Sequence, residues 1–189
     1  MSLECVETSL PGIKVFIPSR LEDDRGSFQE LLHEPKYREH GVSGLFAQCN
    51  VSHSTRGVIR ALHCQRLRPQ AKLVMALAGE ILDVAVDVRR GSPTFGRWRT
   101  EILSGANRRQ IFIPEGFAHG FQVLSDAAEV LYFCSRPYEP GDELGIAWDD
   151  PDLAIPWRRD ASPPVLSAKD RQNPMLASIP PDRLPAFRA

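Results

Sequence analysis

The chain has 189 residues, a formal net charge of −1 and a hydrophobic content of 42%, which is enough to bury one hydrophobic core and predicts a single domain over residues 1–189. Because nucleic acids and anionic membranes attract proteins with a basic excess, this balance favours neither partner. A negatively charged ligand would have to be met by locally placed Arg and Lys side chains.

The amino-terminal segment MSLECVETSLPG has an acidic residue where a signal peptide has positive charge, and no apolar h-region follows it. No later stretch approaches the roughly 18 apolar residues that span a bilayer. The cysteines Cys5, Cys49, Cys64 and Cys134 form no CxxC pair, so we expect reduced thiols in a soluble, cytoplasmic protein. Cys49 and Cys64 lie in apolar, strand-like runs and are expected to be buried as small hydrophobic residues.

Short β-like runs, separated by Gly and Pro, follow one another along the chain. The segment EPKYREHG at 34–41 has the pattern of a short helix that ends at glycine. Strands are predicted at 13–18, 57–63, 72–79, 80–88, 98–103, 109–114, 119–124 and 129–134. Many short strands with regular turn signals indicate an antiparallel sandwich or barrel.

Two regions depart from simple alternation. In EILDVAVDV at 80–88, apolar residues of both parities are interrupted by Asp83 and Asp87, which predicts a strand that is covered on both faces. The chain from Asp149 onward is rich in Pro, Asp and Arg and is expected to wrap the core irregularly, with one short helix near 167–177.

The stretch RGVIRALHCQ at 56–65 raises the question of what His63 does. A barrel metal site is commonly marked by an H-x-H pair, and this chain has none, since its five histidines are spread over positions 33, 40, 53, 63 and 119. No metal is therefore predicted. Nucleophilic catalysis is not supported either, because Cys64 points to the opposite face of the strand and no GxSxG elbow or glycine-rich phosphate loop is present.

Proton transfer is the third interpretation of His63. Strict alternation puts Ile59, Ala61 and His63 on one face and Arg60 on the other, unless a bulge redirects one of them. Tyr132 and Tyr138 could serve as proton donors or could simply pack in the core and at its rim. The residues taken alone leave His63 open between a structural imidazole and a base.

Several segments together resemble the dTDP-4-dehydrorhamnose 3,5-epimerase family, in an order and spacing that cover nearly the whole chain. They are EDDRGSFQE at 22–30, QCNVSHSTRGVIRALHCQ at 48–65, QAKLV at 70–74, GEILDVAVDVRRGSPTFGRW at 79–98, IFIPEGFAHGFQVLSD at 111–126, EVLYFCSRPYEP at 129–140, WDDPDLAIPW at 148–157 and LSAKD at 166–170.

The resemblance implies an all-β, cupin-like antiparallel jelly roll with a few short helices, which works without metal or other cofactor. Family members isomerise a nucleotide-linked 4-keto-6-deoxyhexose by moving protons next to the ketone. Carried over by motif, His63 is the general base and Asp170 holds its imidazole. Lys72 lies near the C4 oxygen, and Tyr132 is the proton donor on the opposite face of the sugar.

The resemblance also implies how the nucleotide is bound and a homodimer with shared sites. Residues that reach in from the neighbouring subunit would be Arg25, Phe28 and Glu30. Residues of the same subunit would be Gln48, Asn50 and Arg60, with His119, Tyr138, Glu143 and Lys169 completing the nucleotide pocket or its edge. An arginine fork suits diphosphate oxygens.

The leading hypothesis is a 3,5-epimerase that converts dTDP-4-dehydro-6-deoxy-D-glucose to dTDP-4-dehydro-L-rhamnose. Ala61, Cys64 and Phe133 stand where the family commonly has other residues, which keeps open a mono-epimerase that inverts only C3 or only C5 of a related sugar. A non-catalytic nucleotide-sugar-binding jelly roll and a ketoisomerase of the same broad fold are further alternatives. The residues do not decide the sugar product or its pathway.

Overall fold

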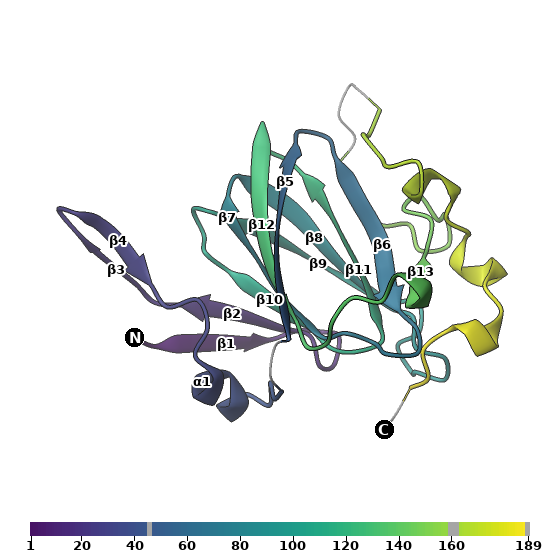
Figure 1. Cartoon of the computed structure of the whole chain (residues 1–189), viewed down its shortest axis with the longest axis horizontal. Coiled ribbons are helices and arrows are strands. Elements are labelled where there is room, and N and C mark those ends of the chain that lie inside the picture. Colours follow the sequence, from purple (N-terminus) through teal and green to yellow (C-terminus); the bar gives the residue numbers. More distant parts are fainter. Residues whose placement is uncertain (45–46, 159–162, 188–189) are drawn as a thin grey trace.

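Antiparallel strands of the chain form two sheets that face each other in a sandwich (Figure 1). The computed structural model describes residues 1–44, 47–158 and 163–187. The six-stranded sheet has the order β1 (Leu3–Glu7), β2 (Lys14–Pro18), β10 (Gln110–Ile113), β7 (Lys72–Ala78), β12 (Ala127–Cys134) and β5 (Gln48–Thr55). The five-stranded sheet has the order β13 (Glu143–Gly145), β6 (Ile59–Gln65), β11 (Phe117–Val123), β8 (Glu80–Asp87) and β9 (Trp98–Ser104).

Apolar side chains from the inner faces of both sheets make the central core. This core includes Val74, Ala76, Ile81, Ala85, Leu103, Ile111, Ile113, Phe117, Phe121, Val123, Ala128 and Val130. Strands that are neighbours in a sheet are often far apart in the sequence; β7, for example, lies between β10 and β12. This strand order confirms the predicted all-β jelly-roll class. Val58 and Tyr132 pack at the edge of this core, where it gives way to a polar cleft.

The outer face of each sheet is covered as well. Helix α1 (Glu34–Glu39) packs Tyr37 against Phe16 of β2, with ring centroids 4.8 Å apart. The carboxyl-terminal segment, green to yellow in Figure 1, covers the five-stranded sheet and supplies Leu153, Leu176 and Ile179 to a second apolar cluster. Because both faces of β8 are thereby covered, nearly all of its residues are buried, as its imperfect alternation predicts.

A hairpin stands apart from this sandwich. Strands β3 (Arg20–Asp23) and β4 (Gly26–Gln29) pair only with each other and project from the body beside β1 and β2 (Figure 1). Its cross-strand pair Leu21 and Phe28 is 58% and 64% exposed. An isolated two-stranded hairpin is marginally stable in water, so this element needs a partner surface.

The eight strands and the helix predicted from the sequence are all present, with bounds that differ by a few residues. The sequence reading misses β1, the β3–β4 hairpin, β5 and β13 because their residues are polar or mixed. The short helix expected near 167–177 differs from the structure in number and type. That region holds two single-turn 3-10 helices, η2 (Asp170–Gln172) and η3 (Leu176–Ser178), while η1 (Pro140–Asp142) and η4 (Pro181–Arg183) flank them along the chain.

All four cysteines are free. Cys64 is buried as expected, whereas the expectation for Cys49 is wrong, because this residue is exposed. Cys49 lies on the edge strand β5, whose odd-numbered residues point away from the sandwich while Gln48 and Asn50 line a pocket between the sheets. Within the described ranges, none of the helices has the length and apolar character needed to cross a membrane.

Candidate active site

A polar cleft opens between the two sheets and has two lobes that share His63, Lys72, Tyr132, Tyr138 and Glu143. The Arg60 lobe, of about 530 Å³, is also lined by Arg60, Ser52, Phe121, His119, Lys169 and Asp170. The Gln48 lobe, of about 300 Å³, is also lined by Gln48, Asn50, Cys64, Gln65, Gln70 and Cys134. The cleft thus collects the four residues that the sequence assigns to proton chemistry.

The imidazole of His63 is bound to a carboxylate from the carboxyl-terminal segment. His63 Nε2 lies 2.6 Å from Asp170 Oδ1, and the side chains are 25% and 5% exposed. The turn η2 places Asp170 there, and the Asp170 N–H donates to Ser167 Oγ. Burial alone would raise the pKa of Asp170, but hydrogen bonding and charge attraction from His63, together with Ser167 and Lys169, bring this pKa below its ordinary value. A carboxylate only accepts, so the arrangement puts a proton on Nε2 and leaves Nδ1 free to act as a base.

Arg60 and His63 line the same cleft, which corrects the alternation expected for this strand. In β6, His63 pairs with His119 of β11 but Arg60 pairs with Phe121, so β6 carries one extra residue at a register shift. The neighbours Ala61 and Leu62 consequently both join the outer apolar cluster. The bulge is the device that turns both polar side chains inward.

Tyr132 faces this pair from the other sheet. It lies on β12, between Asn50 of β5 and Val74 of β7, and it lines both lobes. Burial raises the pKa of Tyr132 above its ordinary value of 10.0, and the nearby Arg60 opposes this. The phenol therefore keeps its proton at neutral pH and can act as an acid.

Lys72 begins β7 beside Cys134 of β12 and Ile113 of β10. Burial lowers the pKa of its ammonium from 10.5, while Cys134, Cys64, Asp83 and Glu143 oppose this shift. Within the described part of the chain, the ammonium has no hydrogen-bond or ion-pair partner. An ammonium held without a partner in a cleft is ready to meet a developing negative charge.

The sequence reading missed one buried acid next to the cleft. Asp83 of β8 accepts from His119, with 2.7 Å between Oδ2 and Nε2, and the two side chains are 0% and 8% exposed. The sequence signal for Asp83 was its position within an apolar strand. A buried charge without a partner is energetically costly, so a partner for this carboxylate could have been expected. His119 is the direct cross-strand neighbour of His63, so it lies at the proton-transfer end of the cleft, beside the candidate base.

A chain of hydrogen bonds ties the remaining polar residues of the cleft together. Tyr138 OH donates to Glu143 Oε2 at 2.6 Å, Lys169 binds the same carboxylate oxygen, and Gln48 accepts from the Tyr138 N–H at 2.7 Å. Gln48 in turn donates to Asn50. The hydrogen bond to Glu143 raises the pKa of Tyr138 to about 12, and these contacts form a polar wall at one side of the cleft.

The three residues assigned to a neighbouring subunit do not line the cleft of their own chain. Arg25 lies at the hairpin tip and pairs with Asp23 at 2.5 Å, and Phe28 is exposed beside it. Glu30, just after β4, pairs with Lys36 of α1 at 2.5 Å. Their location on the projecting hairpin and its base leaves them free to contact another molecule.

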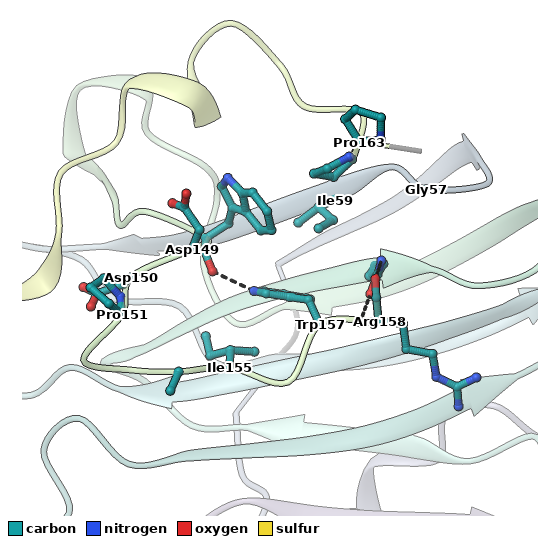
Figure 2. Close-up of a pocket in the computed structure, with 13 residues that line it drawn as sticks. Gly57, Ile59, Asp149, Asp150, Pro151, Ile155, Trp157, Arg158 and Pro163 are labelled. Carbon is teal, nitrogen blue, oxygen red and sulfur yellow. Dashed lines mark hydrogen bonds between the residues drawn. The ribbon is translucent and has the colours of Figure 1, made fainter. Parts of the chain in front are cut away.

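A further cavity, of about 630 Å³, lies on the outer side of the five-stranded sheet and has a different chemistry. Figure 2 shows Trp157, Ile155 and Ile59 along it, and the Trp157 indole N–H donates to the backbone oxygen of Trp148. No His, Lys or Tyr of the described ranges lines it. Among the described residues, no group of three or more His, Cys, Asp or Glu side chains is arranged to hold a metal ion.

The chemistry that this cleft can perform follows from the placement of its groups. His63 projects from the five-stranded sheet and Tyr132 from the six-stranded sheet, so a ligand between them meets a base on one side and an acid on the other. Lys72 adds a positive charge. This set can remove a proton beside a carbonyl group, stabilise the enolate oxygen and return a proton to the opposite face.

Comparison with known proteins agrees with this chemistry. Residues 7–178 match the profile of the family described as dTDP-4-dehydrorhamnose 3,5-epimerase. The chain is 48% identical to proteins of that name from Methanothermobacter thermautotrophicus, over 88% of this chain and 90% of the relative, and from Pseudomonas aeruginosa, over 93% and 97%. A crystal structure of dTDP-6-deoxy-D-glucose-3,5-epimerase from Legionella pneumophila, in complex with dTDP-4-keto-L-rhamnose, is 44% identical and superposes with a TM-score of 0.97 over 100% of both chains.

Proposed function

Because the chain belongs to the dTDP-4-dehydrorhamnose 3,5-epimerase family, we propose that it converts dTDP-4-dehydro-6-deoxy-D-glucose to dTDP-4-dehydro-L-rhamnose by inverting C3 and C5. It is a carbohydrate epimerase, and hence an isomerase. The observation that carries the proposal is the placement of His63 and Tyr132 on facing sheets around one cleft.

In the first step, His63 takes the proton from a carbon next to the C4 ketone. The C–H electron pair moves into the ring, and the negative charge develops on the C4 oxygen. Asp170 fixes the imidazole through Nε2, so Nδ1 is the nitrogen that receives the proton. The carboxylate also stabilises the imidazolium that forms, as in other His–Asp pairs.

Stabilisation of the enolate makes this step possible, since a proton beside a ketone is far too weakly acidic for imidazole alone. Lys72 carries an ammonium in the cleft that no described residue pairs with, and we assign it to the C4 oxygen. A charged donor that is fixed before the reaction needs no reorganisation as charge develops.

Tyr132 then completes the inversion. Its phenol, held neutral by burial, donates a proton to the carbanion carbon from the face opposite His63. The C–H bond that forms points the other way from the one that broke. After His63 releases its proton to solvent and Tyr132 takes one up from solvent, repetition at the second carbon gives the doubly inverted sugar.

The nucleoside diphosphate occupies the rest of the cleft in this proposal. Arg60 is fixed by its Nε–H bond to Ser54 Oγ at 3.0 Å, and we assign its guanidinium to diphosphate oxygens, which suit paired N–H donors. Residues of the polar wall that would bind the nucleotide are Gln48, Asn50, Tyr138, Glu143 and Lys169.

A homodimer with shared sites is part of the same proposal. The hairpin exposes Phe28 and Leu21 to solvent and carries Arg25 at its tip. A second copy that accepts this hairpin would cover its apolar pair and bring Arg25, Phe28 and Glu30 to the partner's cleft. Light scattering after size-exclusion chromatography tests the dimer, and a monomer at micromolar concentration would contradict it.

Three sequence-based expectations stay predictions. The apolar core shared by both sheets supports a single domain over residues 1–189. Limited proteolysis would test this prediction. Four free thiols suit a reducing compartment such as the cytoplasm, which cell fractionation would check. Independence from a metal cofactor is tested by chelation, as described below.

Proton NMR of dTDP-4-dehydro-6-deoxy-D-glucose in deuterated water tests the reaction, with C3 and C5 followed separately. Deuterium at both carbons, and L-rhamnose once a reductase is added, is the expected result. Exchange at one carbon would mean a mono-epimerase. No exchange would overturn the proposal in favour of a different sugar or of a binding role.

A further inference from the structure

Beside the His63–Asp170 pair, the cleft has a second histidine–carboxylate pair that the mechanism above does not use. His119 of β11 binds Asp83 of β8 through Nε2, and both side chains are almost fully buried. His119 lines the Arg60 lobe with Lys72 and Tyr132, while Asp83 lies behind it. Asp83 is therefore shielded from a ligand and can influence it only through its neighbours.

The surroundings of Asp83 are unusual for a structural carboxylate. Its second oxygen, Oδ1, is buried and has no hydrogen-bond partner among the described residues. A buried carboxylate with one unsatisfied oxygen is costly unless nearby positive charge compensates it. Asp87, four residues along the same strand, shows the contrast, because both of its oxygens are bound by Arg89, Ser92 and Thr94.

The positive charge available to Asp83 is in the cleft. Lys72 is close enough for Asp83 to favour its charged form, and His119 becomes a second cation whenever it is protonated. The hydrogen bond through Nε2 leaves Nδ1 of His119 as the ring nitrogen without a partner in the described part of the chain. One carboxylate thus stands behind two groups that can carry positive charge and that line the same lobe.

We infer that Asp83 is a positioning residue for the enolate: it binds Nε2–H of a doubly protonated His119, whose Nδ1–H donates to the C4 oxygen beside the Lys72 ammonium. This inference rests on the proposed function. When His119 is protonated, Lys72 and His119 together carry two positive charges and Asp83 carries one negative charge. The negative charge of the enolate balances the one positive charge that remains. The proton stays on His119, so no further proton transfer is added to the reaction.

The substitution Asp83→Asn tests this directly, because asparagine keeps the size of the side chain and removes its charge. We expect kcat to fall about 10²-fold, as for the loss of one oxyanion donor, with KM changed by less than about threefold. His119→Gln should cause a loss of similar size. The double variant should be slower than His119→Gln by less than about twofold, since two residues that act through one group are not additive.

A matched control is Asp87→Asn, which removes another fully buried carboxylate from β8 but leaves the cleft untouched. It should lower the melting temperature with kcat unchanged. Ring 15N and proton NMR of His119 gives a readout without turnover. The wild-type protein should show protons on both Nε2 and Nδ1, and Asp83→Asn should shift the population of ring protonation states.

The outcomes separate this inference from the proposed function. If the wild-type protein fails to epimerise the dTDP-ketosugar, the proposed function fails. If the wild-type protein is active and Asp83→Asn is equally fast with unchanged His119 resonances, only the inference is overturned. The inference would also be overturned if the losses of kcat in the two single variants multiplied in the double variant, because Asp83 would then act independently of His119.

Discussion

His63 Nε2 and Asp170 Oδ1 lie 2.6 Å apart, although 107 positions separate the two residues in the chain. One comes from a strand of the five-stranded sheet and the other from a 3-10 turn of the carboxyl-terminal segment. The bond selects the ring nitrogen that faces the ligand. It is the relationship on which the proposed base depends.

Asp170→Asn should therefore lower kcat by about 10²–10⁴-fold, the range typical of general base catalysis. The amide can donate to His63 and can stabilise the wrong tautomer, while the fold stays intact. The measurement is the initial rate of solvent deuterium incorporation at C3 and C5. A control is Asp150→Asn, a buried carboxylate that accepts from the Leu176 N–H outside the cleft; equal losses in the two variants would point to a structural effect.

Tyr132→Phe should hurt inversion more than exchange. His63 can still remove the proton and return a solvent deuteron to the same face, whereas delivery to the opposite face loses its donor. We expect deuterium to enter with retained configuration while epimer formation falls by about 10²-fold or more. Phe121→Leu, a change of another cleft residue without an ionisable group, serves as a control. Parallel loss of exchange and inversion in Tyr132→Phe would argue against a separate donor.

The pH profile should report Lys72. Burial lowers its pKa below 10.5, so the ammonium that stabilises the enolate is lost as pH rises through that lowered value. Tyr132, whose pKa is raised above 10.0, keeps its proton over the same range. We expect kcat to decline as the pH rises at values below 10.5, the ordinary pKa of lysine.

Lys72→Arg provides the comparison for this decline. A guanidinium stays protonated throughout the range, so the alkaline decline should disappear or move to higher pH, even though kcat itself is lower. The profiles are measured from initial rates at saturating substrate. An unchanged decline in Lys72→Arg would assign it to another group.

Hybrid dimers should show whether the hairpin completes the partner's site. His63→Ala and a hairpin variant with Arg25→Ala and Phe28→Ala should each be inactive alone. When the two are unfolded and refolded together, half of the dimers are mixed and each has one intact site, which gives about a quarter of wild-type activity. No recovery, with mixed dimers verified by mass spectrometry, would mean that each hairpin serves its own chain.

Chelation should leave the rate unchanged. His63 and His119 each use one nitrogen to bind a carboxylate, and the described residues hold no cluster of ligands for a metal. The activity is measured after prolonged treatment with EDTA and again after zinc or magnesium is added back. A large loss that metal restores would overturn the predicted metal-independent reaction.

Much of the fold could be predicted because strand signals are local. The apolar runs of β7, β8 and β12 and the turn residues between them identify those strands from a few neighbouring positions. The polar strand β5 and the hairpin could not be found in this way. Their side chains face a cleft or solvent, so they carry no apolar pattern.

The residues proposed here as catalytic could be named from the sequence only through the motifs that contain them; they are His63, Lys72, Tyr132 and Asp170. Taken as a strand of period two, β6 separates Arg60 from His63, and nothing local reveals the register shift with β11 that brings them together. In the sequence, Asp83 stands out only as an interruption of β8, and no local pattern indicates its bond to His119.

The amino-acid sequence was sufficient to identify the apolar strands, the residue types available for proton chemistry and the family that the chain resembles. The tertiary structure alone decided that His63 and Tyr132 face each other from different sheets, that Arg60 shares their cleft and that Asp83 stands behind His119. Strand patterns can be recognised locally because side-chain periodicity depends on neighbouring residues. The meeting of side chains in one cleft depends instead on strand register and on sheet packing between segments far apart in the chain.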